Sequence, residues 1–266
     1  MILRIRSQTM EVVMNKFFKM SIIWGIFLWL LLFLSPSPSQ AGEPLRVAAA
    51  ANLLYPMQEI AQAFRAKTGE EVSLVFNSSG KLLSLIEQGA PFDLFFSADT
   101  RRPQYLARKG VCLSPVTYTR GVLVLWSRYQ DICALGWPKA LLKVNRLAIA
   151  DPKLAPYGEA AMVALKNSGL WESISSKVVK AFTVSQAFQW AESGNAEAGL
   201  VSLSLALSPP GRKGCYLRIE TAPLVEQAAC VLKKSKQLQQ AEAFLRFVLS
   251  PEAQAILARY GYAGRP

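Results

Sequence analysis

The chain has 266 residues and a formal net charge of +12, with 30 Lys and Arg against 18 Asp and Glu. This length allows one or two domains with a large apolar core. The chain contains no histidine, and its four cysteines form no CxxC pair, which argues against a zinc site and a histidine-based catalytic triad. The basic residues form no run of five and no stripe interleaved with aromatics, so nucleic acid is not an expected partner.

Residues 1–41 have the pattern of a secretory signal peptide. Lys16 and Lys19 precede the apolar run 22–34, and Ser39 and Ala41 stand at the small-residue positions of a cleavage site. The alternative is a retained membrane anchor, although the apolar run is short for a span of about 20 residues. Removal of residues 1–41 takes away four basic residues and one acidic residue, which lowers the net charge from +12 to +9. The sequence therefore predicts an exported protein.

An oxidising compartment makes one or two disulfides plausible. Four cysteines allow three pairings, and their spacing does not choose among them. The residues concerned are Cys112, Cys133, Cys215 and Cys230.

In the first half of the chain, two strands are each followed by a polar residue and a helix. Residues 45–51 and 72–76 are typical of buried strands, and the helix after each follows three-and-four apolar spacing. Asn52 lies at the first junction, and Ser78 and Ser79 lie at the second. The simplest role of such residues is helix capping. Parallel strands place these junctions on one edge of a sheet, so we expect Asn52 and Ser79 to converge.

The rest of the chain repeats this unit. The predicted strands are 92–96, 121–126, 147–150, 178–182, 198–202, 215–219 and 228–232, with helices over 103–109, 241–249 and 252–260. Asp99 is expected to cap a helix, residues 202–208 form a small polar segment, and further helices start at Tyr157 with Gly158 and at Val184. We expect strand 121–126 to enter a second domain and strand 228–232 to return to the first.

Four helix starts thus gather around a cleft between two α/β lobes. A helix N-terminus has unpaired backbone N–H groups and about half a positive charge, which suits an anion. N–H and hydroxyl donors favour a deprotonated tetrahedral oxyanion, which only accepts hydrogen bonds. An enzyme is a weaker interpretation, because Ser78, Ser79 and Asn52 have no histidine to activate them.

Five segments carry a resemblance to a known family: 47–53, 76–80, 89–99, 147–158 and 250–261. In this order and spacing, residues 45–262 resemble the periplasmic molybdate-binding proteins of bacterial ABC transporters. The resemblance implies a type II periplasmic binding protein fold, with mixed, mainly parallel sheets flanked by helices. The implied first lobe comprises 42–120 and 226–266, and the second comprises 121–225. The implied protein is a monomer without a cofactor, which delivers molybdate or tungstate to an inner-membrane ABC permease.

The same resemblance implies the ligand contacts. They fall on Asn52 and Ser79 in the first lobe and on Tyr157 and Val184 in the second, the last two through the main chain. Additional candidates are Ser78, Gly158 and Ser202. Some relatives place a tyrosine hydroxyl on the oxyanion where this chain has Ser202, and Tyr157 could supply that hydroxyl or merely cover the cleft as a rim aromatic.

Molybdenum enters this interpretation only as the bound oxyanion. Sulfate or phosphate on the same fold is the alternative ligand. Ferric iron is disfavoured, because the chain has no histidine to join its tyrosines. The sequence does not distinguish molybdate from tungstate.

Overall fold

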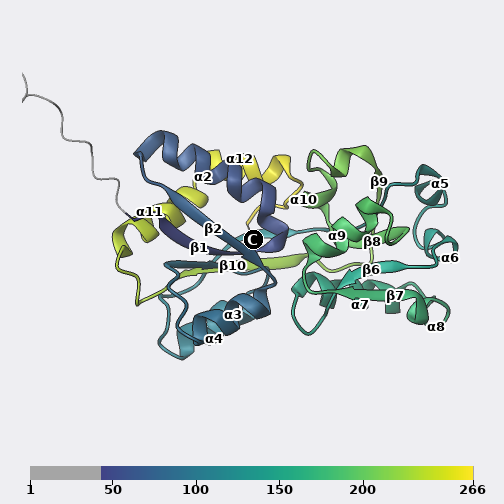
Figure 1. The fold of residues 1–266 in the computed structure, drawn as a ribbon, viewed down its shortest axis with the longest axis horizontal. Helices are drawn as coiled ribbons and strands as arrows, with labels where there is room; N and C mark the ends of the chain where they lie inside the picture. The colour runs from purple at the N-terminus through teal and green to yellow at the C-terminus, as the bar shows by residue number, and fades with distance from the viewer. Residues whose placement is uncertain (1–42, 266) are drawn as a thin grey trace, which may run out of the picture. The chain divides into compact units, whose positions relative to one another are not determined.

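The computed structural model describes residues 43–265, so the predicted signal peptide lies outside the described part. Two five-stranded sheets organise these residues (Figure 1). The first sheet has the order β2 (Val72–Asn77), β1 (Leu45–Ala50), β3 (Leu94–Phe96), β10 (Val225–Val231) and β4 (Val116–Gly121). The second has the order β7 (Val178–Ala181), β6 (Leu147–Ala150), β8 (Ala198–Ser202), β5 (Leu123–Ser127) and β9 (Cys215–Arg218).

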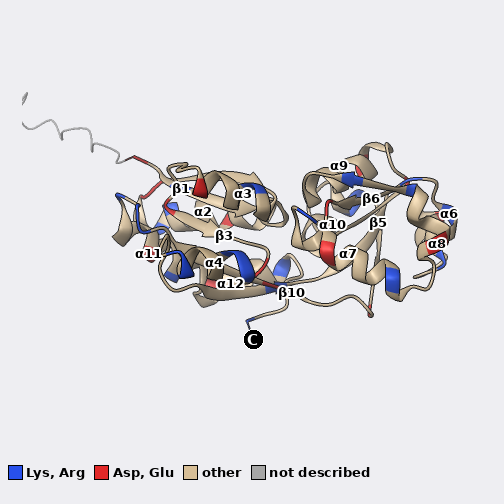
Figure 2. Ribbon diagram, turned by 90° about the horizontal axis from the view of Figure 1, so that it is seen from below, with Lys and Arg blue, Asp and Glu red and all other residues tan. Residues whose placement is uncertain are grey.

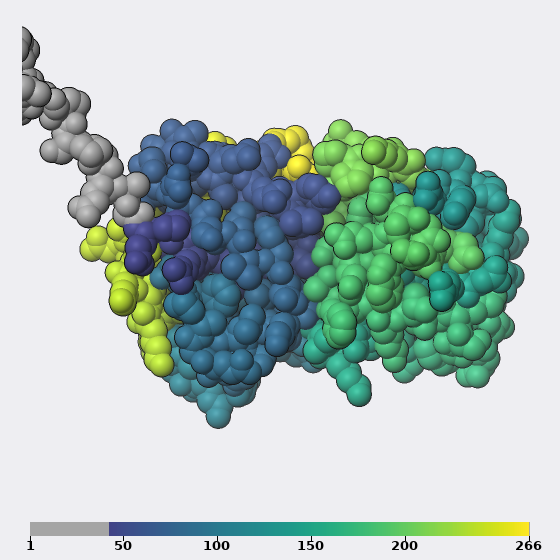
Figure 3. All heavy atoms as spheres, viewed as in Figure 1, coloured from purple at the N-terminus to yellow at the C-terminus, as the bar shows by residue number. Residues whose placement is uncertain are grey.

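We call the elements around the first sheet the first lobe and those around the second sheet the second lobe. The first lobe contains η1 (Ala51–Leu53), α2 (Leu54–Thr68), α3 (Ser79–Glu87), α4 (Arg101–Arg108), α11 (Leu238–Val248) and α12 (Pro251–Arg259). The second contains α5 (Gln130–Cys133), α6 (Ala140–Lys143), α7 (Pro156–Asn167), α8 (Trp171–Ile174), η2 (Ser175–Lys177), α9 (Val184–Ser193), α10 (Leu203–Ala206) and η3 (Gly211–Lys213). Figure 3 shows the green and teal residues of the second lobe gathered apart from the purple and blue residues of the first.

Both sheets are mixed, as predicted. In the first, β1 pairs in parallel with β2 and β3, and β10 pairs antiparallel with β3 and β4. In the second, β6 pairs in parallel with β7 and β8, and β5 pairs antiparallel with β8 and β9. Parallel pairings are therefore half of the total in each sheet. The chain leaves the first sheet at Val122 and returns to it through residues 219–224. The predicted division into a lobe of residues 42–120 with 226–266 and a lobe of residues 121–225 remains a proposal.

Helices cover both faces of the first sheet, and successive side chains of its strands pack against opposite helix layers. Val47 and Ala49 of β1 pack with α2, α11 and α12, whereas Ala48 between them packs with α3 and α4. On β3, Phe96 packs with α2, α11 and α12, and Phe95 packs with α3 and α4. Successive side chains of a strand point to opposite faces, so helices must cover both sides of such an apolar sheet.

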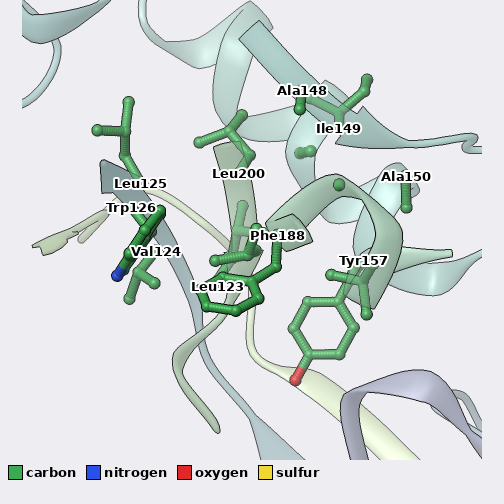
Figure 4. Packing of buried hydrophobic residues seen from close by; sticks show 14 of the residues in the cluster. Leu123, Val124, Leu125, Trp126, Ala148, Ile149, Ala150, Tyr157, Phe188 and Leu200 are labelled. Carbon is green, nitrogen blue, oxygen red and sulfur yellow. The ribbon is translucent and has the colours of Figure 1, made fainter. Parts of the chain in front are cut away.

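The second lobe has one main apolar cluster, which Figure 4 shows from close by. Trp126 of β5 and Phe188 of α9 meet edge to face with ring centroids 4.8 Å apart. The Trp126 indole donates a hydrogen bond to the carbonyl of Gly211 at 2.8 Å. The cluster also includes Ala50, Ala51 and Ala98 of the first lobe, so the two cores are in contact at this edge.

Several boundaries differ from the sequence prediction. Strand β4 was not expected, and the predicted strand 121–126 divides into the last residue of β4 and the first four residues of β5. The predicted polar segment 202–208 contains the four-residue helix α10, which is too short for apolar periodicity to reveal. Thr100, rather than Asp99, is the residue before α4, although the Asp99 carboxylate still accepts a hydrogen bond from the Arg102 N–H at 2.9 Å.

One disulfide, Cys133–Cys215, joins α5 to β9 in the second lobe. Cys112 and Cys230 are free thiols buried in the first lobe. In the part of the chain that the structure describes, no helix is both long and apolar enough to cross a membrane.

Candidate functional site

The four predicted helix starts lie where the two lobes meet. Asn52 follows β1, Ser79 opens α3, Tyr157 is the second residue of α7 and Val184 opens α9. All four are buried. The η1 turn that carries Asn52 packs against α9, so first-lobe and second-lobe helix starts are neighbours. The structure thus brings together residues that are up to 132 positions apart in the sequence, between Asn52 and Val184.

Asn52 is the most informative of these residues. Its Nδ2 donates hydrogen bonds to Gln227 Oε1 at 2.9 Å and to the Tyr262 hydroxyl at 2.8 Å. Among residues 43–265, Asn52 Oδ1 is the one buried side-chain nitrogen or oxygen without a hydrogen-bond partner. An unpaired buried polar atom costs about 1–3 kcal/mol, which makes this amide a candidate ligand contact.

The two serines of the α3 start have different roles. Ser78 is the N-cap, with its hydroxyl accepting from the Lys81 N–H at 3.4 Å. The Ser79 hydroxyl accepts from the Ala98 N–H at 3.0 Å and keeps its own proton to donate. Ser79 therefore has a hydroxyl donor available at a helix N-terminus, whereas Ser78 already serves the helix itself.

Gly80, the next residue of α3, touches the second lobe. Its N–H donates to the Leu154 carbonyl at 2.9 Å. A Cβ at this position would lie 2.9 Å from the same carbonyl oxygen. The close approach of the two main chains therefore requires glycine.

The α7 start contributes Tyr157 and Gly158. The Gly158 N–H donates to the Ala155 carbonyl at 2.9 Å, and a Cβ on Gly158 would lie 2.3 Å from the Ala150 carbonyl. Gly158 thus lets α7 pack closely on β6 and already has a partner for its N–H. The Tyr157 ring is buried, so it is not an exposed rim aromatic.

The Tyr157 hydroxyl points away from the apolar side chains of the second lobe (Figure 4). It accepts a hydrogen bond from Gln227 Nε2 at 3.4 Å. Burial raises the pKa of Tyr157 well above its ordinary value, so the hydroxyl keeps its proton at neutral pH.

The α9 start is capped by Thr183, whose hydroxyl accepts from the Gln186 N–H at 3.0 Å. Val184 is the first residue of the helix, and the first N–H groups of an α-helix have no partner within that helix. Its apolar side chain belongs to the second-lobe cluster. Only the main chain of Val184 can therefore act as a donor to a ligand.

Ser202, at the end of β8, is linked to Asn52 through a neighbour. Its hydroxyl lies 2.9 Å from the Ser204 hydroxyl, and Ser204 donates to the Asn52 carbonyl at 2.7 Å. The Tyr262 hydroxyl donates to the same carbonyl at 2.9 Å. Ser202 thus belongs to a buried polar network that supports the Asn52 turn.

Sequence reasoning did not find four members of this network: Tyr118, Ser204, Gln227 and Tyr262. Gln227 could have been noticed as a polar residue inside the apolar run 225–231. Tyr262 could have been noticed because it follows directly after the C-terminal motif 250–261.

Charged side chains contribute little to the four positions. Arg102, whose Nη2 lies 3.4 Å from a Cβ placed on Gly80, is paired with Asp99. Within residues 43–265, no group of three or more His, Cys, Asp and Glu is placed to hold a metal ion. Figure 2 shows Lys and Arg mixed with Asp and Glu over both lobes. The site therefore offers neutral donors to an anion.

One ion pair connects the lobes. Arg101 Nη2, on α4, donates to both carboxylate oxygens of Glu159, on α7, at 2.6 Å. The bonds to Glu159 raise the pKa of the Arg101 guanidinium. The other ion pairs among the described residues join groups of the same lobe.

Two α/β lobes with helix N-termini converging between them define a solute-binding protein. Comparison with known proteins agrees: the bacterial extracellular solute-binding protein family matches residues 45–263. The chain is 38% identical over 229 residues to the molybdate-binding protein ModA of Rhodobacter capsulatus, covering 85% of this chain and 90% of that protein. It is also 38% identical over 235 residues to ModA of Azotobacter vinelandii, covering 84% of this chain and 91% of that protein.

The solved periplasmic molybdate-binding protein of Azotobacter vinelandii superposes on this structure with a TM-score of 0.79 and 31% identity. The superposition covers 84% of this chain and 100% of that one. The chain belongs to the bacterial extracellular solute-binding protein family. The resemblance and fold class predicted from the sequence are confirmed, and the protein is a binding protein rather than an enzyme.

Proposed function

We propose that this protein captures molybdate, or its analogue tungstate, in the periplasm and delivers it as a monomer to an inner-membrane ABC permease. The observation that carries the proposal is the meeting of four buried helix starts, where the Ser79 hydroxyl keeps its proton to donate and the first main-chain N–H groups of the helices have no partner within the helix. The molybdate-binding relatives support the choice of anion. In this proposal residues 1–41 direct export, and residues 121–225 form the lobe that closes on the other.

Each ligand contact has a defined donor in this proposal. Ser79 donates from its hydroxyl and Asn52 donates from its amide when that amide presents its N–H₂ group to the ligand. Tyr157 and Val184 donate from main-chain N–H groups at the starts of α7 and α9. Because the Tyr157 hydroxyl is directed to Gln227, we assign the ligand contact of Tyr157 to its main chain. Ser78, Gly158 and Ser202 support the site through the cap, the helix packing and the Ser204 contact.

These donors suffice for micromolar binding without a cation. A helix N-terminus contributes roughly 0.3–1 kcal/mol to a nearby anion, and a hydrogen bond to a charged acceptor contributes about 1.5–3 kcal/mol. A micromolar dissociation constant corresponds to about 8 kcal/mol. Three helix starts and two side-chain donors reach that value near the upper end of these contributions, and hydrogen bonds from the main-chain N–H groups of Tyr157 and Val184 add to it.

Size selects among dianions of the same shape. Molybdate is larger than sulfate, and both only accept hydrogen bonds. A smaller anion inside a shell of fixed donors leaves some of them unpaired, at about 1–3 kcal/mol for each buried donor. We therefore expect molybdate and tungstate to bind far more tightly than sulfate.

Hydrogenphosphate is the second candidate, and one contact favours it. It carries an O–H group, for which the unpaired Asn52 Oδ1 would be a suitable acceptor. Molybdate has no proton to give and needs the Asn52 amide to present its N–H₂ group instead. The two anions thus require opposite orientations of this amide.

Calorimetric titration of residues 43–266, stripped of bound anions, tests the proposal with molybdate, tungstate, sulfate and phosphate. We expect one-to-one binding of molybdate and tungstate, with sulfate and phosphate at least about a hundredfold weaker, which is about 2.7 kcal/mol. If phosphate bound more tightly than molybdate, phosphate would be the ligand and the proposed site would stand. Absence of heat with all four anions would overturn the oxyanion function.

A further inference from the structure

Gln227 lies at the centre of the polar network, on β10 of the first sheet, and is fully buried. Its Oε1 accepts hydrogen bonds from Asn52 Nδ2 and from the Tyr118 hydroxyl, both at 2.9 Å. Its Nε2 donates to the Tyr157 hydroxyl of the second lobe at 3.4 Å. One carboxamide therefore joins two predicted ligand-binding residues that come from different lobes.

In this arrangement the Asn52 amide has its acceptor unpaired and both of its donor protons in use. That orientation suits no fully deprotonated oxyanion. A carboxamide has nearly the same shape after a half-turn that exchanges its oxygen and nitrogen. The orientation of Asn52 is therefore decided by the hydrogen-bonding groups around it, of which Gln227 is one that can turn in the same way.

A half-turn of both amides satisfies every member of the network except Asn52 Nδ2. Gln227 Nε2 then donates to Asn52 Oδ1 and to the Tyr118 oxygen, and Gln227 Oε1 accepts from the Tyr157 hydroxyl. The Tyr262 hydroxyl, which accepts from the Asn52 amide and donates to the Asn52 carbonyl in this structure, then donates its proton to Asn52 Oδ1 instead, and Ser204 still donates to that carbonyl. Tyr118 still has the Ser97 carbonyl as its acceptor, at 3.2 Å.

The tyrosines can make these bonds because they stay protonated. Burial raises the pKa of Tyr118, Tyr157 and Tyr262 above the ordinary value. Each hydroxyl can therefore reverse between donor and acceptor by rotating its proton. The single group left without a partner after the half-turn is Asn52 Nδ2, a donor with two protons at the ligand position.

We propose that Gln227 is a positioning residue that sets which atom of the Asn52 amide faces the ligand, and that oxyanion binding turns the two amides together. This inference rests on the proposed oxyanion function, since it assumes that Asn52 donates to the ligand. Because Gln227 also contacts Tyr157, the turn links the state of the first-lobe donor to a second-lobe side chain.

Gln227→Glu is the sharpest test, because it replaces only the N–H₂ group. A carboxylate accepts hydrogen bonds and donates none, so it holds Asn52 Nδ2 toward itself and Asn52 Oδ1 toward the ligand. We expect molybdate affinity, measured by calorimetry, to fall about 10- to 100-fold. Gln227→Met is a second, uncharged variant, which no longer fixes Asn52 and is expected to show a smaller loss.

A double-mutant cycle with Asn52→Ala separates orientation from charge and packing. Without the Asn52 amide, Gln227→Glu and Gln227→Met should each cost at most about a third of the fold-change that they cost in its presence. NMR of side-chain amides adds a direct signal: molybdate should shift the Asn52 and Gln227 N–H₂ resonances in the wild type and leave Asn52 unshifted in Gln227→Glu. Thermal unfolding without ligand shows whether each variant is folded.

Equal losses with and without the Asn52 amide would overturn the positioning role, since Gln227 would then act by charge or packing alone. If the wild type binds molybdate and shows no such coupling, only this inference fails. If the wild type binds no oxyanion, the proposed function and this inference fail together.

Discussion

The two lobes have the same strand arrangement but present their donors differently. In each sheet, three neighbouring strands are parallel, a fourth strand (β10 or β5) runs antiparallel to them, and an edge strand (β4 or β9) runs antiparallel to that fourth strand; helices begin where the three parallel strands end. The first lobe places Asn52, Ser78 and Ser79 at these starts, whereas the second places Tyr157 and Val184. The same backbone geometry therefore supplies side-chain donors in one lobe and main-chain donors in the other.

This difference separates adjustable donors from fixed ones. A main-chain N–H at a helix start keeps its position whatever side chain the residue carries. A side-chain donor changes with the residue and depends on its neighbours for orientation, as Asn52 depends on Gln227 and Tyr262. We expect substitutions in the first lobe to change affinity and selectivity more than equivalent ones in the second.

The largest expected effect is the contrast between Asn52→Ala and Val184→Ala. Loss of the Asn52 amide should weaken molybdate binding about 10- to 100-fold, because a donor to a charged acceptor is removed. Val184→Ala should stay within about twofold of the wild type, because the main-chain N–H remains. Calorimetric titration of both variants measures the contrast, and a loss for Val184→Ala as large as for Asn52→Ala would contradict it.

A smaller effect is expected where the lobes touch. Gly80→Ala puts a methyl group 2.9 Å from the Leu154 carbonyl, so closure is opposed and molybdate affinity should fall about tenfold. The dissociation rate, measured by stopped-flow displacement, should carry most of the change. Gly264→Ala is the matched control, since its added Cβ would meet no atom within 4 Å. Equal rates for the two variants would show that this contact does not oppose closure.

Loss of the Arg101–Glu159 ion pair between the lobes should change molybdate binding less than Gly80→Ala does. Arg101 and Glu159 are partly exposed, with 66% and 40% of their side chains accessible, and exposed pairs contribute only about 0.2–1 kcal/mol. Arg101→Gln should therefore raise the molybdate dissociation rate about two- to fivefold at low salt, and high salt should remove the difference. Arg259→Gln, which breaks a pair within the first lobe, is the control. A salt-independent effect would contradict the electrostatic explanation.

The smallest effect near neutral pH is expected from the buried tyrosines, Tyr118 and Tyr262 in the first lobe and Tyr157 in the second. Their pKa values are raised by burial, so the folded protein keeps protons that the unfolded chain releases above pH about 10. The resulting stability is present below that pH and is lost as pH rises toward the folded pKa values.

Denaturant unfolding from pH 7 to 11 measures this dependence. We expect a constant free energy of unfolding up to about pH 9 and a decline above it. Tyr118→Phe should reduce the decline, and Tyr216→Phe, at a partly exposed position of β9, should not. A decline that is unchanged in Tyr118→Phe would show that other groups cause it.

Local pattern was enough to predict the helix starts. Asn52, Ser79 and Val184 each stand between a short apolar strand and a helix with regular spacing, and both signals lie within about 15 residues. Family motifs then suggested which of these starts share a ligand. The main-chain N–H groups at these starts follow from helix geometry, whereas the orientation of the Asn52 amide depends on distant contacts.

The polar network could not be predicted in the same way. Gln227 is 175 positions from Asn52, and Tyr262 is 210 positions from it. No local pattern encodes which buried amide meets which hydroxyl across such separations. The cysteine pairing was hidden for the same reason, because Cys133 and Cys215 meet only when α5 packs beside β9.

The Cys133–Cys215 disulfide makes the stability of the second lobe depend on whether its compartment is oxidising. The covalent loop from residue 133 to 215 contains β6, β7, β8 and the starts of α7 and α9. A disulfide of this kind stabilises by about 2–4 kcal/mol, mainly by restricting the unfolded chain. A reduced chain lacks that restriction. In an exported protein, full stability of the second lobe would therefore come only after translocation, when oxidation closes the loop.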